Sequence, residues 1–106
     1  MAPSANAPRR TLEWRVLSFL CANFGDAEIF EQSGARDLTE NHFLDPVHRA
    51  LFLEISQCRA RSLSREQLRR RLPEVMTRLG WPDLDFDFLF SPPHPDAKSI
   101  RELVSS

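Results

Sequence analysis

The stretch that most constrains the fold is residues 42–55, which joins a clear helix start to the densest apolar run of the chain. Asp45 suits the N-cap position, where its carboxylate accepts hydrogen bonds from free backbone N–H groups, and Pro46 falls at the first helical position, where a missing N–H does no harm. The apolar residues that follow recur at helical spacing: Val47, Ala50, Leu51, Ile55 and Cys58. Phe52 and Leu53 widen this stripe, so we expect the central helix of the fold here, contacted on more than one side.

His48 lies three residues after Asp45, at the start of this helix. We expect its imidazole to be held against the N-terminal cap of its own helix or against a neighbouring carbonyl group. Asp45, Pro46 and His48 therefore have structural roles in this interpretation.

Residues 42–55 read HFLDPVHRALFLEI, an aromatic residue followed by Asp-Pro-x-His-Arg and an apolar helix. This segment resembles one shared by two related helical domains of bacterial DNA replication. One is the N-terminal domain of DnaB-type replicative helicases, and the other is the C-terminal, helicase-binding domain of DnaG-type primases. The resemblance is strongest over residues 38–55. It implies a non-catalytic protein-interaction domain whose partner is a hexameric replicative helicase or a primase.

Composition favours one helical domain. The 106 residues suffice for one core and are too few for two, and 42% hydrophobic content with only three Gly fits a packed domain. No apolar run approaches the roughly 20 residues that span a bilayer, so we expect a cytoplasmic protein without a membrane segment. Cys21 and Cys58 each lie among apolar residues and are expected to be buried free thiols.

Residues 1–10 are small, polar and rich in proline, and we expect a flexible tail followed by a helical interaction domain over residues 11–106. A first helix is predicted from an N-cap at Thr11, with an apolar face formed by Leu12, Val16, Phe19, Leu20 and Phe24. Gly25 is expected to end it, and Asp26 to cap a short helix over residues 27–32 that ends at Ser33-Gly34. One short helical turn over residues 38–43 should then point Leu38 and Phe43 inward.

A later helix is predicted after an N-cap at Ser62 or Ser64, with an apolar face formed by Leu68, Leu72, Val75, Met76 and Leu79. Pro73 predicts a kink or a break near Leu72. Residues 81–90 predict an extended connection or a short helical turn that carries Phe86, Leu89 and Phe90 into the core. A rigid turn over residues 91–95 and a last helix over residues 96–104, capped by Asp96, complete an all-α bundle of about five or six helices.

The sequence contains no recognisable catalytic motif. The three His and two Cys lack the close spacing of zinc ligands, and Asp83, Asp85 and Asp87 are not followed by the Gly and Glu that a calcium loop requires. Three Gly leave little scope for a phosphate-binding loop. We therefore expect no catalytic residue, no metal site and no cofactor.

Charge is segregated along the chain. Residues 25–54 hold seven acidic residues and two Arg, a net charge of −5, whereas residues 59–78 hold seven Arg and two Glu, a net charge of +5. The Arg side chains of this second segment either grip phosphates or carboxylates of a partner or pair with the chain's own acidic residues. A small nucleic-acid-binding protein is the alternative function. The total charge of −1 and the lack of aromatic residues between Arg59 and Arg78 predict that DNA binding is weak at most.

The expected binding surface combines aromatic and Arg side chains near the carboxyl-terminal helices of a monomer or weak dimer. Aromatic side chains and Arg are frequent anchors in protein interfaces. The candidate partner-binding residues are Trp81, Phe86, Phe88, Phe90, Arg65, Arg69, Arg70 and Arg71.

Overall fold

The computed structural model describes residues 7–91 and 97–105. Within these residues it contains six α-helices, two short 3-10 helices and no strand, so the all-α fold class is confirmed. The elements in chain order are α1 (Ala7–Ala22), α2 (Ala27–Ser33), η2 (Ala35–Asp37), η3 (Glu40–His42), α3 (Pro46–Ala60), α4 (Arg65–Arg78), α5 (Phe86–Phe90) and α6 (Lys98–Val104). None of the described helices is both long enough and apolar enough to cross a bilayer.

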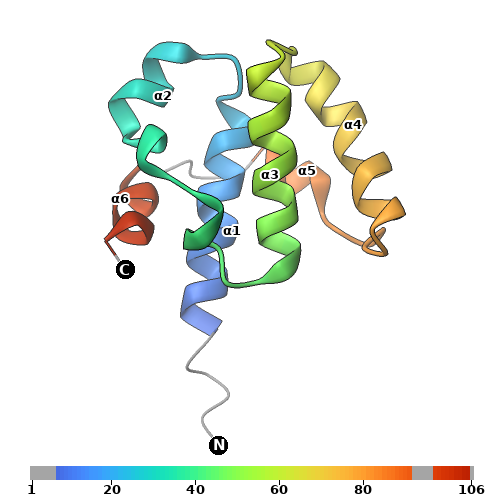
Figure 1. Cartoon of the computed structure of the whole chain (residues 1–106), viewed down its shortest axis with the longest axis horizontal. Coiled ribbons are helices and arrows are strands. Elements are labelled where there is room, and N and C mark those ends of the chain that lie inside the picture. Colours follow the sequence, from blue (N-terminus) through green and yellow to red (C-terminus); the bar gives the residue numbers. More distant parts are fainter. Residues whose placement is uncertain (1–6, 92–96, 106) are drawn as a thin grey trace, which may run out of the picture.

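Helix α1 is the centre of the bundle. It packs against α3, α4, α5 and α6, and Figure 1 shows it running through the middle of the molecule, with α6 on one side and α4 and α5 on the other. Residues 16–21 of α1 are all buried, so this half of the helix is surrounded rather than covered on one face. The helix that we expected at the centre, α3, has its main contacts with α1, α4 and η3. Helix α1 is central because six consecutive residues, 16–21, are all buried, and the density of an apolar run in the sequence does not identify the central helix.

Helix α1 also begins earlier than expected, at Ala7 instead of after Thr11. Two Arg side chains of its first turns are tied to other parts of the chain. Arg9 donates from Nε to Glu13 and from Nη2 to the carbonyl of His42, and Arg10 pairs with Asp45 at 3.0 Å. Of the predicted tail, residues 7–10 are therefore helical, and residues 1–6 lie outside the described residues.

Helix ends follow the local sequence closely. Gly25 and Gly34 have φ angles of +94° and +82°, the left-handed conformation that glycine adopts without strain after a helix. Asp26 caps α2 by accepting a hydrogen bond from the Ile29 N–H at 3.1 Å. Ser64, not Ser62, caps α4, and its hydroxyl accepts from the Gln67 N–H at 3.1 Å. These hydrogen bonds confirm the predicted caps. The sequence could predict them because each cap depends only on residues within three positions.

Of the kink or break predicted near Leu72, the break is not found, because α4 runs without interruption through Pro73. Proline removes one backbone hydrogen bond, and the remaining bonds of the 14-residue helix keep it continuous. Leu68, Leu72 and Met76 form its buried face, as expected. Leu79 does not belong to that face, because it is 52% exposed at the C-cap position.

Helix α5 is the short helical turn predicted after residue 81. Asp85 caps it by accepting from the Phe88 N–H at 3.0 Å, and Phe86, Leu89 and Phe90 are buried in the core. Helix α6 buries Ile100 and Leu103. The predicted cap at Asp96 and most of the rigid turn lie outside the described residues, which resume at residue 97.

Both cysteines are buried free thiols, as predicted. Burial raises the pKa of Cys21 far above its ordinary value. Burial, together with the hydrogen bond and negative charge of Glu54, raises the pKa of Cys58 to about 11. Both side chains therefore remain neutral thiols at physiological pH.

Candidate functional site

The start of α3 has the structure that its sequence predicts. Asp45 is the N-cap, and its Oδ1 accepts hydrogen bonds from the Val47 N–H at 2.8 Å and the His48 N–H at 3.4 Å, while Pro46 occupies the first helical position. The structural roles assigned to Asp45 and Pro46 follow from these contacts.

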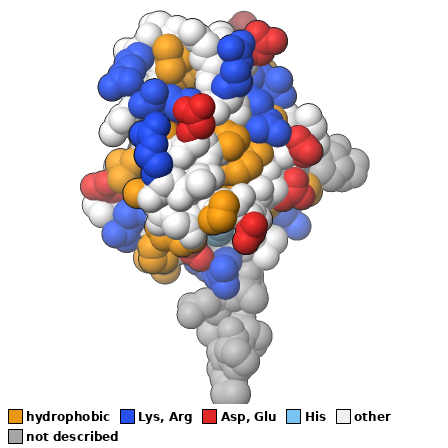
Figure 2. Space-filling view, turned by 90° about the vertical axis from the view of Figure 1, so that its right-hand side faces the viewer, with side chains coloured by type: hydrophobic (Ala, Val, Ile, Leu, Met, Phe, Trp, Pro, Cys, Tyr) orange, Lys and Arg blue, Asp and Glu red, His pale blue; other side chains and the backbone are white. Residues whose placement is uncertain are grey.

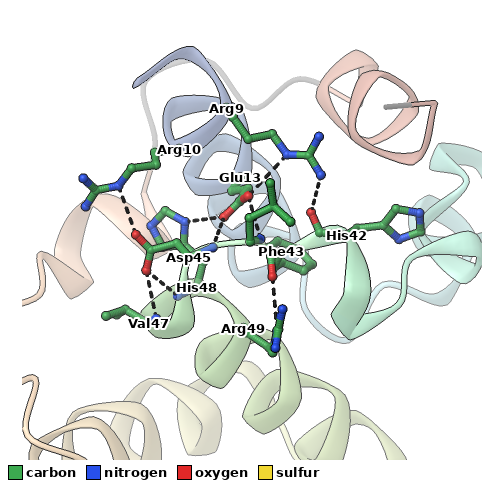
Figure 3. A network of polar contacts seen from close by, with 10 residues as sticks. Arg9, Arg10, Glu13, His42, Phe43, Asp45, Val47, His48 and Arg49 are labelled. Carbon is green, nitrogen blue, oxygen red and sulfur yellow. Dashed lines mark hydrogen bonds and ion pairs between the residues drawn. The ribbon is translucent and has the colours of Figure 1, made fainter. Parts of the chain in front are cut away.

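Glu13 of α1 is the centre of the polar network around this helix start (Figure 3). Its side chain has no exposed surface. One carboxylate oxygen contacts His48 Nδ1 at 2.9 Å and accepts from the Asp45 N–H at 3.3 Å. The other accepts from the Leu44 N–H at 2.9 Å and from Arg9 Nε at 3.3 Å. One buried carboxylate thus joins α1 to the segment that leads into α3.

The partner of His48 differs from the expected one. We expected its imidazole to contact its own helix cap or a carbonyl group, but its ring contacts Glu13 of α1. The sequence carries a signal for this contact that we did not use. Glu13 lies four residues before Leu17 and seven before Leu20, so it shares their buried face, and a buried carboxylate requires partners.

The Arg side chains of α4 are largely engaged within the molecule. Arg69 pairs with Asp87 of α5 at 2.8 Å, and Arg65 donates to the carbonyl of Phe90. Arg71 forms an ion pair with Glu54 of α3, whose hydrogen bond and charge raise the pKa of the guanidinium. Arg70 is exposed and lies 3.9 Å from Glu66 on its own helix.

These pairs place acidic side chains among the Arg side chains of α4. Figure 2, which looks onto the right-hand side of Figure 1, shows basic side chains in blue separated by acidic side chains in red and hydrophobic ones in orange. The basic side chains visible on this face therefore form no continuous surface. Internal pairing is the interpretation that these contacts favour.

The four aromatic candidates occupy different environments. Phe86 and Phe90 are only 8% and 4% exposed, so they belong to the core rather than to an exposed surface. Arg69 lies over both rings, with its guanidinium carbon 5.8 Å and 5.6 Å from their centroids. Trp81 is half-buried. Phe88 is 36% exposed and stacks on Trp14 of α1, with ring centroids 6.3 Å apart.

A groove that sequence reasoning missed lies at the end of α1, between α2 and the loop from α3 to α4. Its volume is about 690 Å³. Seven of its fifteen lining residues are buried or half-buried apolar side chains, and these are Phe19, Leu20, Phe24, Ile29, Phe30, Ile55 and Leu63. Its rim is exposed and includes Asp26 and Ala27 on the α2 side and Ser62 and Ser64 on the other. This combination of an apolar floor and a polar rim is typical of a binding site.

A second, smaller hollow of about 240 Å³ adjoins this groove. The residues that line both are Leu20, Phe30, Ile55 and Arg59. Arg59 lies over the Phe30 ring, with its guanidinium carbon 3.3 Å from the ring centroid. The two hollows together with this pair form the surface that we call the α1–α2 groove.

In the part of the chain that the structure describes, no three His, Cys, Asp or Glu side chains are grouped so that they could hold a metal ion. Comparisons of the chain with protein-family models, curated proteins and solved structures gave no match.

Proposed function

We propose that this chain is a non-catalytic interaction domain of the bacterial DNA-replication machinery that binds a protein partner in the α1–α2 groove. The observation that carries the proposal is the groove itself, because its floor combines three aromatic side chains, Phe19, Phe24 and Phe30, with aliphatic ones. A pocket of this kind suits the apolar anchor residues of a partner protein. The hexameric replicative helicase, or a primase, is the proposed partner, in the cytoplasm.

The connection to replication rests on the resemblance of residues 38–55 to the domains shared by replicative helicases and primases. Both of those domains act through protein contacts. The function proposed for this chain is accordingly binding, without a catalytic step or a cofactor.

DNA binding is the alternative, and the contacts of the Arg side chains argue against it. A protein that binds DNA uses cations that are free to neutralise phosphates. Here Arg65, Arg69 and Arg71 contact Phe90, Asp87 and Glu54 within the chain. We expect only weak, salt-sensitive binding to single- or double-stranded DNA at about 0.15 M salt.

The test is a calorimetric titration of the chain with the replicative helicase of the organism from which it comes. Two matched variants localise the binding. Ala27 is exposed on the groove rim, so Ala27→Trp blocks the groove, whereas Ala60 is exposed at the end of α3 outside it, so Ala60→Trp serves as the control.

We expect a Kd of tens of micromolar or tighter for the unmodified chain and for Ala60→Trp, and loss of binding for Ala27→Trp. A chain that binds DNA with sub-micromolar affinity, lost in the Arg69, Arg70 and Arg71 to Ala triple variant, and that does not bind the helicase would refute the proposal.

A further inference from the structure

We infer that the occupant of the α1–α2 groove is an acidic amphipathic segment of the partner, in which a carboxylate between two apolar anchors pairs with Arg59. This inference rests on the proposed function and adds the chemistry of the partner to it. Three features of the groove carry it. Arg59 has no acidic partner among the described residues, two hollows lie beside it, and the nearby acidic side chains already have partners of their own.

Arg59 is exposed and contacts the Phe30 ring with the face of its guanidinium. Among residues 7–91 and 97–105 no carboxylate forms an ion pair with it, whereas Arg69, Arg70 and Arg71 each have an acidic partner. A cation–π contact uses the flat face of the guanidinium and leaves N–H donors at its edge. Those donors match the two oxygens of a carboxylate.

The chain's own acidic side chains near the groove already have partners. Asp26 caps α2 through the Ile29 N–H, Glu28 accepts from Gln32, and Glu31 pairs with Arg36 at 3.0 Å. An acidic group for Arg59 is therefore best supplied by another protein. Arg65, at the start of α4, also lines the groove and adds positive charge, so the wall formed by the end of α3 and the start of α4 favours an acidic segment.

The position of Arg59 between the two hollows defines the pattern of the segment. Arg59, Leu20, Phe30 and Ile55 line both the hollow of about 690 Å³ and that of about 240 Å³. A segment that fills both with apolar side chains passes over the guanidinium between them. Apolar anchors on either side of an acidic residue are the arrangement that an amphipathic helix or strand presents.

The experiment is a selection of displayed random peptides on the immobilised full chain. The Ala27→Trp variant measures the selection that depends on the groove. The Arg59→Glu variant reverses the charge, Arg59→Gln removes it while keeping much of the stem, and Arg61→Glu is the matched control. Arg61 is an exposed residue two positions away that does not line either hollow. Far-ultraviolet circular dichroism of each variant confirms that the helical fold is retained.

Peptides enriched on the unmodified chain are expected to contain Asp or Glu between apolar residues and to lose binding to Ala27→Trp. Their affinity should fall about tenfold or more in Arg59→Glu and less in Arg59→Gln, with no change in Arg61→Glu. A new selection on Arg59→Glu should enrich Lys or Arg in place of the acidic residue.

Two kinds of failure are distinguishable. Groove-dependent peptides without an acidic preference would overturn the inference about Arg59 and leave the proposed function intact. The absence of any groove-dependent peptide would refute both the inference about Arg59 and the proposed function. Native mass spectrometry of the same preparation identifies the remaining occupants: a dimer that dissociates in Ala27→Trp, or a retained small molecule displaced by that variant, would also overturn the inference.

Discussion

Substitution of Glu13 by Gln tests whether the buried carboxylate needs both of its oxygen atoms. Oε1 contacts His48 Nδ1 and the Asp45 N–H, and Oε2 accepts from the Leu44 N–H and Arg9 Nε. Gln has the same length but offers one carbonyl oxygen, and its NH2 group faces the donors that the second oxygen served. A hydrogen bond that involves a charged group contributes about 1.5 to 3 kcal/mol, so two lost bonds lower the free energy of unfolding by about 3 kcal/mol or more.

Urea unfolding followed by far-ultraviolet circular dichroism measures this loss. A domain of this size has an unfolding free energy of about 5 to 15 kcal/mol, so the variant should remain folded in the absence of urea. The control is Arg10→Ala, which removes the ion pair with Asp45 from a side chain that is 67% exposed, and should cost less than about 1 kcal/mol. If Glu13→Gln costs no more than this control, the carboxylate does not hold α1 to α3 in the way described.

Three further outcomes follow from burial. Leu51→Ala should lower the free energy of unfolding by about 2 to 5 kcal/mol because Leu51 is fully buried, whereas Arg70→Ala on the exposed face should leave it almost unchanged in the same urea measurement. Ser18→Ala should raise it by about 1 kcal/mol, because the buried Ser18 hydroxyl has no hydrogen-bond partner among the described residues and Ala is the better helix former. Because the folded-state pKa of Cys58 is raised from 9.0 to about 11, the thiol ionises first in the unfolded chain, so the stability it contributes is complete below pH 9 and is lost between about pH 9 and pH 11. Urea titrations across that range, compared with those of Cys58→Ala, measure the loss.

The features predicted correctly from the sequence are those that short segments decide. Asp45 with Pro46, and Ser64 as one of two candidate caps, mark helix starts through contacts between near neighbours, and the structure has both starts. The inward positions of Leu38 and Phe43 followed in the same way from one turn of chain. Helix propensity and helix capping can be predicted from a single sequence because they need no information about distant residues.

The features that were missed depend on distant pairs. Glu13 meets His48 across 35 positions, and this contact, together with Arg9 on the His42 carbonyl, accompanies the earlier start of α1. The α1–α2 groove is assembled from two distant stretches of the chain, residues 19–38 and 52–65, so neither stretch alone indicates it. Phe86 and Phe90 were assigned both to the core and to the candidate binding surface, because an aromatic residue in a short segment fits a core and an interface equally well, and the structure buries them.

The central position of α1 has a consequence for the kinetics of folding. Its packing partners α3, α4, α5 and α6 all follow it in the chain, and α6 is the last described helix. During synthesis α1 therefore precedes every helix that buries it. Its environment is complete only after α6, the described helix farthest from it in sequence, has packed against it. Folding rates fall as contacts become less local, so this bundle should fold more slowly than an up-and-down bundle of the same size, in which each helix packs on its neighbour in sequence.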